Sequence, residues 1–257
     1  MSISTTATST TIALVTGGSR GIGEATALAL ADRGTDVIVT YVANEAAANV
    51  VVEAIRAKGR RAAALQLDVT DTASFAGFVS RTREVLSSWG RERFDFLINN
   101  AGTGGGGLVA DTSEAVFDSL VAAHFKGPFF LTQRLLPVLN DGGRIVNVSS
   151  GLSRYAMAGI GAYSAVKGAM DVVSRVLAVE LGPRQITVNV VAPGGIATDF
   201  GGGVMRDEGM QRAVSADTPL GRMGQPVDVA GAIAMLLGAD AGWVTGQRIE
   251  VTGGYRL

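Results

Sequence analysis

The chain has no cysteine and a single histidine among its 257 residues. Without cysteine it cannot form disulfides, thiolate metal sites or a cysteine nucleophile. One histidine also rules out a multi-histidine metal site. The 22 Lys and Arg residues are balanced by 23 Asp and Glu residues, so the basic excess of proteins that bind nucleic-acid phosphates is missing. We therefore expect neither a metal ion nor a nucleic acid as partner.

Long apolar runs are missing as well. No window reaches the ~18 continuous apolar residues of a membrane span. The Ser/Thr-rich start, MSISTTATSTT, has neither the basic residues nor the apolar run of a secretory signal. We expect residues 1–10 to form a flexible tail, and the protein to be cytoplasmic with no membrane contact. Glycine, by contrast, is in excess at 35 residues, about twice its usual share.

Short apolar runs alternate with longer amphipathic segments along the chain. Strands are expected at 11–16, 36–42, 61–69, 94–99, 142–150, 186–193 and 247–251. Helices are expected at 21–33, 45–58, 72–88, 113–139, 161–182 and 226–238. Strands that are apolar on both faces and alternate with helices predict a parallel sheet covered on two sides. The fold class is therefore α/β, a single doubly wound Rossmann-type domain over 11–257 with a sheet of about seven strands.

A glycine-rich turn, TGGSRGIG, joins the first expected strand to the first helix. Its glycines are Gly17, Gly18, Gly21 and Gly23. Such a turn lets the backbone approach a pyrophosphate, and the helix N-terminus offers free N–H groups to it. A merely structural turn is the alternative.

Tyr163 and Lys167 are four residues apart in an expected helix, so they share one face. A phenol titrates near pH 10, and a neighbouring ammonium group favours its ionised form. The pair therefore makes Tyr163 a candidate general acid and base. Ser150 lies at the end of the fifth strand, and Ser149 should point to the opposite face.

These motifs together resemble the short-chain dehydrogenase/reductase family, in particular its short 3-oxoacyl-reductase-like members. The resemblance spans nearly the whole chain and rests on the glycine turn, Asn99-Asn100-Ala101-Gly102, Ser150, Tyr163-x-x-x-Lys167, Pro193-Gly194 and Gly253-Gly254. It implies an oxidoreductase that moves a hydride between a nicotinamide cofactor and a carbonyl or alcohol substrate. Tyr163 would exchange the proton, Ser150 would hold the substrate oxygen, and Lys167 would hold the ribose and lower the tyrosine pKa. The alternatives are a non-catalytic nucleotide sensor and epimerase, dehydratase or lyase chemistry on the same fold.

The only histidine occupies a position that many relatives give to asparagine. The matching stretch is His124-Phe125-Lys126-Gly127. In relatives that position helps to hold a water that extends the proton relay from the lysine. His124 is therefore a candidate catalytic residue with proton exchange near neutral pH. It can equally pack beside the site with no catalytic role, or mark an impaired enzyme.

The cofactor expected from the resemblance is NADP rather than NAD. NAD-preferring relatives place an Asp where this chain has Tyr41, and the lack of a carboxylate there removes a barrier to a 2′-phosphate. Arg20 and Asn44 are candidate partners of that phosphate, whereas Glu45 argues for NAD. The resemblance also assigns cofactor contacts to Gly17, Ser19, Gly21, Ile22, Gly23, Asp68, Val69, Asn100, Ala101, Gly102, Tyr163, Lys167, Pro193, Gly194, Ile196 and Thr198.

The substrate is expected to meet residues 103–108 and 151–160 and a lid at about 195–223. Candidate apolar wall residues are Leu152, Tyr155, Met157, Val204, Met205 and Met210. Such a wall favours a ketone, a keto ester or a 3-oxoacyl-type compound without naming one. The resemblance further implies a homotetramer built through the fourth and fifth helices and the C-terminal strand region.

Overall fold

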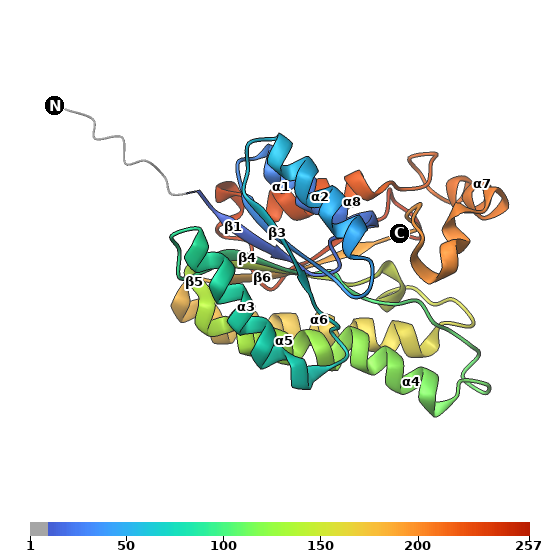
Figure 1. The fold of residues 1–257 in the computed structure, drawn as a ribbon. Coiled ribbons are helices and arrows are strands. Elements are labelled where there is room, and N and C mark those ends of the chain that lie inside the picture. Colours follow the sequence, from blue (N-terminus) through green and yellow to red (C-terminus); the bar gives the residue numbers. More distant parts are fainter. Residues whose placement is uncertain (1–9) are drawn as a thin grey trace.

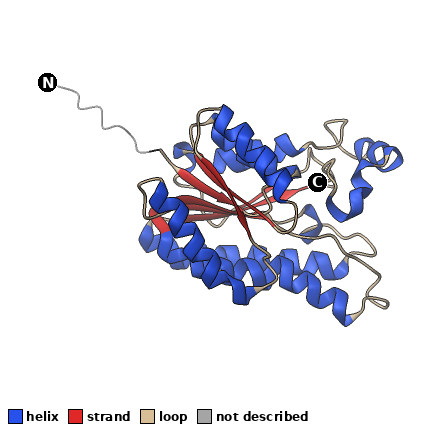
Figure 2. Cartoon of the chain, viewed as in Figure 1, coloured by secondary structure: helices blue, strands red, loops and turns tan. Residues whose placement is uncertain are grey.

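The computed structural model describes residues 10–257, in which seven strands form one sheet (Figure 1, Figure 2). All strand pairs are parallel, in the order β3-β2-β1-β4-β5-β6-β7. The strands are β1 Ile12–Val15, β2 Asp36–Tyr41, β3 Ala62–Gln66, β4 Phe94–Asn99, β5 Leu139–Val148, β6 Thr187–Pro193 and β7 Arg248–Val251. The helices are α1 Gly21–Asp32, α2 Glu45–Ala57, α3 Phe75–Ser88, α4 Glu114–Val121, α5 Gly127–Leu135, α6 Gly161–Leu181, α7 Glu208–Ala216 and α8 Pro226–Leu236. The predicted doubly wound α/β fold is confirmed.

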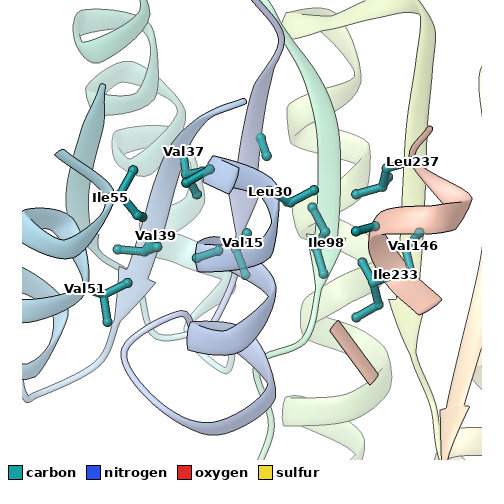
Figure 3. Packing of buried hydrophobic residues seen from close by; sticks show 14 of the residues in the cluster. Val15, Leu30, Val37, Val39, Val51, Ile55, Ile98, Val146, Ile233 and Leu237 are labelled. Carbon is teal, nitrogen blue, oxygen red and sulfur yellow. The ribbon is translucent and has the colours of Figure 1, made fainter. Parts of the chain in front are cut away.

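Two apolar cores lie on the two faces of the sheet. Helices α1, α2 and α8 cover one face, and α3, α5 and α6 cover the other (Figure 1). Figure 3 shows the first core, where Leu30 of α1, Ile233 of α8 and Ile55 of α2 pack with strand residues such as Val15. The β strands are apolar on both faces because each side chain meets a helix layer.

The prediction of one continuous helix over 113–139 is wrong. It is divided into α4, a π-helical turn at Ala122–Lys126 (η2), α5 and a short 3₁₀ turn, and β5 already starts at Leu139. Pro128 lacks an N–H, so it cannot bond the carbonyl of His124 four residues earlier. The helix widens there, and Gly127 N–H reaches back to the carbonyl of Ala122. His124 therefore sits on an interruption of the helix.

The segment between β6 and α8 contains a turn and a helix that were not predicted from the sequence. Phe200–Arg206 (η6) is a turn in which Gly201, Gly202 and Gly203 have φ of 64°, 79° and 79°, a region that favours glycine. Helix α7 follows, capped by the side chain of Asp207. It lies beyond the end of the sheet (Figure 1). Of the expected flexible tail, residues 1–9 lie outside the described residues.

Candidate active site

The predicted site residues meet at the carboxyl edge of the sheet. The turn after β1, Asn100 after β4, Ser150 after β5 and the loop after β6 all follow strand ends. The order of strands reverses between β1 and β4, because β2 and β3 lie on one side and β5 to β7 on the other. A crevice at such a reversal is where open α/β sheets bind ligands.

Three buried side chains form the centre of the site. Lys167 Nζ lies 5.7 Å from the centre of the Tyr163 ring and donates to the Val148 carbonyl oxygen at 2.8 Å. Ser150 acts to lower the pKa of Tyr163, and its hydroxyl oxygen accepts from the N–H of Leu152 at 3.2 Å. Ser149 instead donates to the carbonyl of Lys167. The two serines thus face different partners, as the strand geometry predicts.

Burial sets the protonation of this group. It raises the pKa of Tyr163 to about 12, against the opposing effect of Ser150. Burial also lowers the pKa of Lys167 to about 8, although Asp171 acts in the other direction. The expected lowering of the tyrosine pKa by Lys167 is not found, because the loss of hydration at the phenol dominates. Tyr163 therefore keeps its proton at neutral pH and is poised to donate it.

His124 is in direct contact with Tyr163, the candidate general acid and base. The two rings meet edge to face, with centroids 5.2 Å apart and planes at 85°. His124 Nε2 lies 2.6 Å from the carbonyl oxygen of Thr103, so this nitrogen carries the proton. Burial, then the nearby Lys167, lowers the pKa of His124 to about 3. The expected proton exchange near neutral pH is therefore wrong, since the imidazole is neutral there.

Behind Lys167 lies a small cavity with unsatisfied polar atoms at its wall. Asn99, Asn147, His124 and Lys167 are among the residues that line it. His124 Nδ1 and Asn99 Oδ1 are buried and have no hydrogen-bond partner among residues 10–257. Asn99 Nδ2 donates to Asn147 Oδ1 at 2.7 Å. The cavity thus offers two acceptors beside the lysine.

The glycine-rich turn is held in place by β4. Asn100 Nδ2 donates to the carbonyl oxygens of Thr16 and Gly17 at 2.9 and 3.1 Å. Thr16 Oγ1 accepts from the N–H groups of Asn100 and Ala101, a role that the sequence reading missed. A Cβ at Gly23 would lie 2.2 Å from the carbonyl oxygen of Gly17. The turn therefore depends on glycine and on contacts from the neighbouring strand.

The comparisons agree with this geometry. A family model described as enoyl-(acyl carrier protein) reductase matches residues 17–256. An uncharacterised oxidoreductase of Methylorubrum extorquens is 40% identical over 247 residues, 95% of this chain and 97% of that protein. The chain is a member of the short-chain dehydrogenase/reductase family.

Two further relatives carry more specific names. Versicolorin reductase 1 of Aspergillus parasiticus is 37% identical over 259 residues, 95% of this short-chain dehydrogenase/reductase and 95% of that protein. A blue fluorescent protein from a metagenomic library, solved in complex with NADPH, superimposes with a TM-score of 0.88 at 37% identity. That superposition covers 96% of this chain and 98% of the other. No helix within residues 10–257 combines the length and apolarity needed to cross a lipid bilayer.

The turn of this short-chain dehydrogenase/reductase fits the pyrophosphate of a nicotinamide dinucleotide. Gly17 has φ of 63°, and a Cβ there would lie 3.0 Å from Ala101 Cα, so no side chain fills the cradle. Arg20 precedes α1 without a side-chain capping bond to any described residue. The first N–H groups of α1 are therefore left for a phosphate. Ser19 and Ile22 are half-buried in the same turn.

The residues expected around the adenosine ribose differ in exposure and in hydrogen bonding. Arg20 is exposed. The Oδ1 atom of Asn44 caps α2 by accepting from Ala47 N–H at 2.9 Å, which leaves its amide NH₂ group for a ligand. Burial and the negative charge of the nearby Glu45 raise the pKa of Tyr41.

The remaining predicted contacts divide into those that offer side chains and those that offer only backbone. Asp68 is exposed, and its carboxylate holds the N–H and hydroxyl of Thr70 at 2.8 and 2.7 Å. Val69 and Ile196 are core residues, so only their backbone is available. Pro193 ends β6, Gly194 N–H donates to the Val251 carbonyl, and Thr198 lies beside Gly21.

Gly102 has no room for a side chain because the ring of His124 lies against it. A Cβ at this position would lie 2.4 Å from Cε1 of His124. The close approach is thus to the histidine ring, and the two residues form one packing unit beside Tyr163.

The loops expected to meet the substrate converge over Tyr163. The Phe200 ring lies 6.1 Å from the Tyr163 ring, and Leu152 packs in the same apolar cluster as Tyr163. Tyr155 and Met205 pack instead with Tyr255 of the C-terminus, while Met157, Val204 and Met210 are exposed. Phe200 lies in the expected lid but was not among the expected wall residues, although an aromatic residue before three glycines was the available signal.

Proposed function

We propose that this chain is an NADP-dependent carbonyl reductase or alcohol dehydrogenase in which Tyr163 is the general acid and base. The observation that carries the proposal is the buried group of Tyr163, Ser150 and Lys167 at the carboxyl edge of the sheet, beside a turn that fits a dinucleotide. The named relatives, a versicolorin reductase and an NADPH-bound protein, support it.

The chain's own residues handle the proton. A bound nicotinamide would supply or accept the hydride. Tyr163 donates its proton to the carbonyl oxygen during reduction, and the Ser150 hydroxyl orients that oxygen by a hydrogen bond. Lys167 binds the ribose hydroxyls and holds positive charge next to the phenol. Phe200 and Leu152 exclude water from the reacting carbon.

The substrate is a ketone, a keto ester or a 3-oxoacyl-type carbonyl compound. The apolar side chains beside Tyr163 favour a substrate with little charge near the carbonyl. Because another relative is named trihydroxynaphthalene reductase, aromatic ketones belong in the test panel.

The deciding experiment follows the loss of NADPH absorbance with a panel of aliphatic, acyl and aromatic ketones. Tyr163→Phe should lose more than about 10³-fold in kcat while its Kd for NADPH changes little. Near-normal turnover in that variant would overturn the role of Tyr163. A parent chain that binds NADPH and reduces no carbonyl would instead support the nucleotide-sensing alternative.

His124 serves as an uncharged member of the proton relay. Its Nε2–H is held by Thr103, so Nδ1 is left as an acceptor next to the cavity behind Lys167. His124→Asn should keep the shape of the pH–rate profile, because the imidazole does not titrate near neutral pH. Equal rates in both proteins would mean that His124 only packs.

The protein acts as a cytoplasmic homotetramer. Two separate apolar areas support two interfaces: Val172, Val176 and Val179 on α6, and Trp243 before β7, which is 98% exposed. A tetramer of dihedral symmetry needs more than one interface of this kind.

A further inference from the structure

A partly buried charged network contacts the backbone of Ser150. Arg248 of β7 places Nε 3.0 Å from Asp171 Oδ2. The same guanidinium donates through Nη2 to the carbonyl oxygen of Ser150 at 2.9 Å and to Ser153 Oγ at 3.0 Å. One side chain therefore binds both an acidic residue of α6 and the backbone of Ser150.

Asp171 connects this network to the lysine. It follows Lys167 by one helical turn, so Tyr163, Lys167 and Asp171 lie on successive turns of one face of α6. The Ser153 hydroxyl donates to Asp171 Oδ2 at 2.6 Å. The carboxylate side chain is only 9% exposed, and it is the nearby charge that raises the pKa of Lys167 against the effect of burial.

Stability alone is a weak explanation for such a network. Buried ion pairs lose hydration on folding, and apolar replacements of similar volume are often as stable or more stable. Asp171 Oδ1 is moreover buried without a hydrogen-bond partner among the described residues. The contacts that the network does make lead to the backbone of Ser150 and toward Lys167, both in the proposed active site.

We infer that Arg248 and Asp171 are positioning residues for the proposed reaction. Arg248 fixes the backbone that presents the Ser150 hydroxyl to the substrate oxygen. Asp171 supplies the negative charge that keeps Lys167 in its ammonium form next to Tyr163. The inference rests on the proposed function, because the roles of Ser150 and Lys167 are those assigned there.

Other ionisable groups face this network and define the controls. Glu250, which lies in β7 with Arg248, binds Arg248. Arg154, from the loop after β5, binds Glu250 at 2.8 Å. From α6 come Lys167 and Tyr163, and from the π-helical turn comes the neutral His124. Arg184, in the turn after α6, makes similar contacts away from this network: it donates to Asp141 and to the carbonyl oxygens of Leu136 and Leu139. It is therefore the matched control.

The first test compares Arg248→Met, Arg248→Lys and Arg184→Met. Arg248→Met should lower kcat about tenfold or more and change the KM for NADPH less than about twofold, because the serine loses its backbone support. Arg248→Lys should recover only part of kcat, since an ammonium cannot reach all four acceptors. Arg184→Met should keep the parent kcat. A folded Arg248→Met enzyme with the parent kcat would overturn the role of Arg248.

The second test uses Asp171→Asn, which keeps the size of the side chain and removes the charge. The alkaline limb of the kcat/KM profile should move to lower pH by about one unit, because Lys167 loses its proton more easily. The Lys167 amine, followed by NMR, should titrate lower by a similar amount. An unmoved lysine titration would overturn the role of Asp171 even if the parent enzyme reduced no carbonyl. Lack of turnover in the parent, by contrast, would contradict the proposed function.

Discussion

Burial controls the chemistry of each ionisable side chain at the site more than its neighbours do. It keeps Tyr163 protonated, weakens the hold of Lys167 on its proton and leaves His124 neutral. In the proposed reaction the tyrosine is therefore ready to donate at neutral pH, whereas alcohol oxidation needs the phenolate and should become faster as the pH rises.

The buried His124 should make folding sensitive to acid. Its folded pKa of about 3 lies below the ordinary 6.5, so the unfolded chain takes up a proton that the folded chain refuses. Stability present above pH 6.5 is therefore lost as the pH falls toward 3, by about 2 kcal/mol at pH 5. Urea unfolding of His124→Asn at pH 7.5 and 5 should show a correspondingly smaller difference than the parent. Equal differences in the two proteins would contradict the shift.

Arg20 should contribute to the choice of cofactor. It is an exposed cation in the phosphate turn, and a 2′-phosphate would attract it. Arg20→Leu should lower kcat/KM for NADPH about tenfold and leave the value for NADH nearly unchanged. Steady-state kinetics with both cofactors measures this, with Arg33→Leu after α1 as a surface control. A parent enzyme that prefers NADH tenfold would contradict the NADP assignment.

Site residues can be predicted from local sequence patterns when their partners lie near in sequence or at a strand end. Ser150, Tyr163 and Lys167 could be selected because spacing places them on a strand end and one helix face. Arg248 and Asp171 could not, because they are 77 positions apart and only the folded sheet brings them together. The link between Gly102 and His124 was hidden for the same reason.

Elements were predicted most reliably where apolar periodicity is strong. All seven strands and α1, α2, α6 and α8 appear near their expected bounds. The break at His124 escaped notice because the apolar pattern runs through it, although Pro128 carried the signal. Helix α7 was missed because its sequence, EGMQRAVSA, is mostly polar and follows three glycines.

The lid turn and the loop after β4 touch through backbone, which makes Gly104 a sensitive position. A Cβ there would lie 2.4 Å from Gly201 Cα, so Gly104→Ala should push the two segments apart above Tyr163. We expect the substrate KM to rise several-fold and kcat to fall, with little change in Tm. Gly105→Ala is the matched control, because its Cβ meets only the flexible Leu120 side chain at 3.3 Å. Identical kinetics of the two variants would show that this contact does not matter.

At the scale of the whole molecule, helices α4, α5 and α6 expose a set of large apolar side chains. Among them are Phe117 of α4, Phe129 and Phe130 of α5, and Val179 of α6. These large apolar side chains lie outside the core of the subunit. An exposed apolar patch of this kind marks an interaction surface. Helix α6 thus carries the catalytic tyrosine on its buried face and the proposed subunit contact on the other.

A single charge on that outer face should dissociate the assembly. Val179 is 79% exposed, so aspartate there costs the isolated subunit little, whereas a buried carboxylate in an apolar interface is strongly unfavourable. Sedimentation of Val179→Asp should give a smaller species than the parent. Val50→Asp on α2, where the valine is 67% exposed, tests the same change on the opposite face and should sediment as the parent. A parent that sediments as a monomer, or a Val179→Asp variant that sediments like the parent, would rule out this face as the contact.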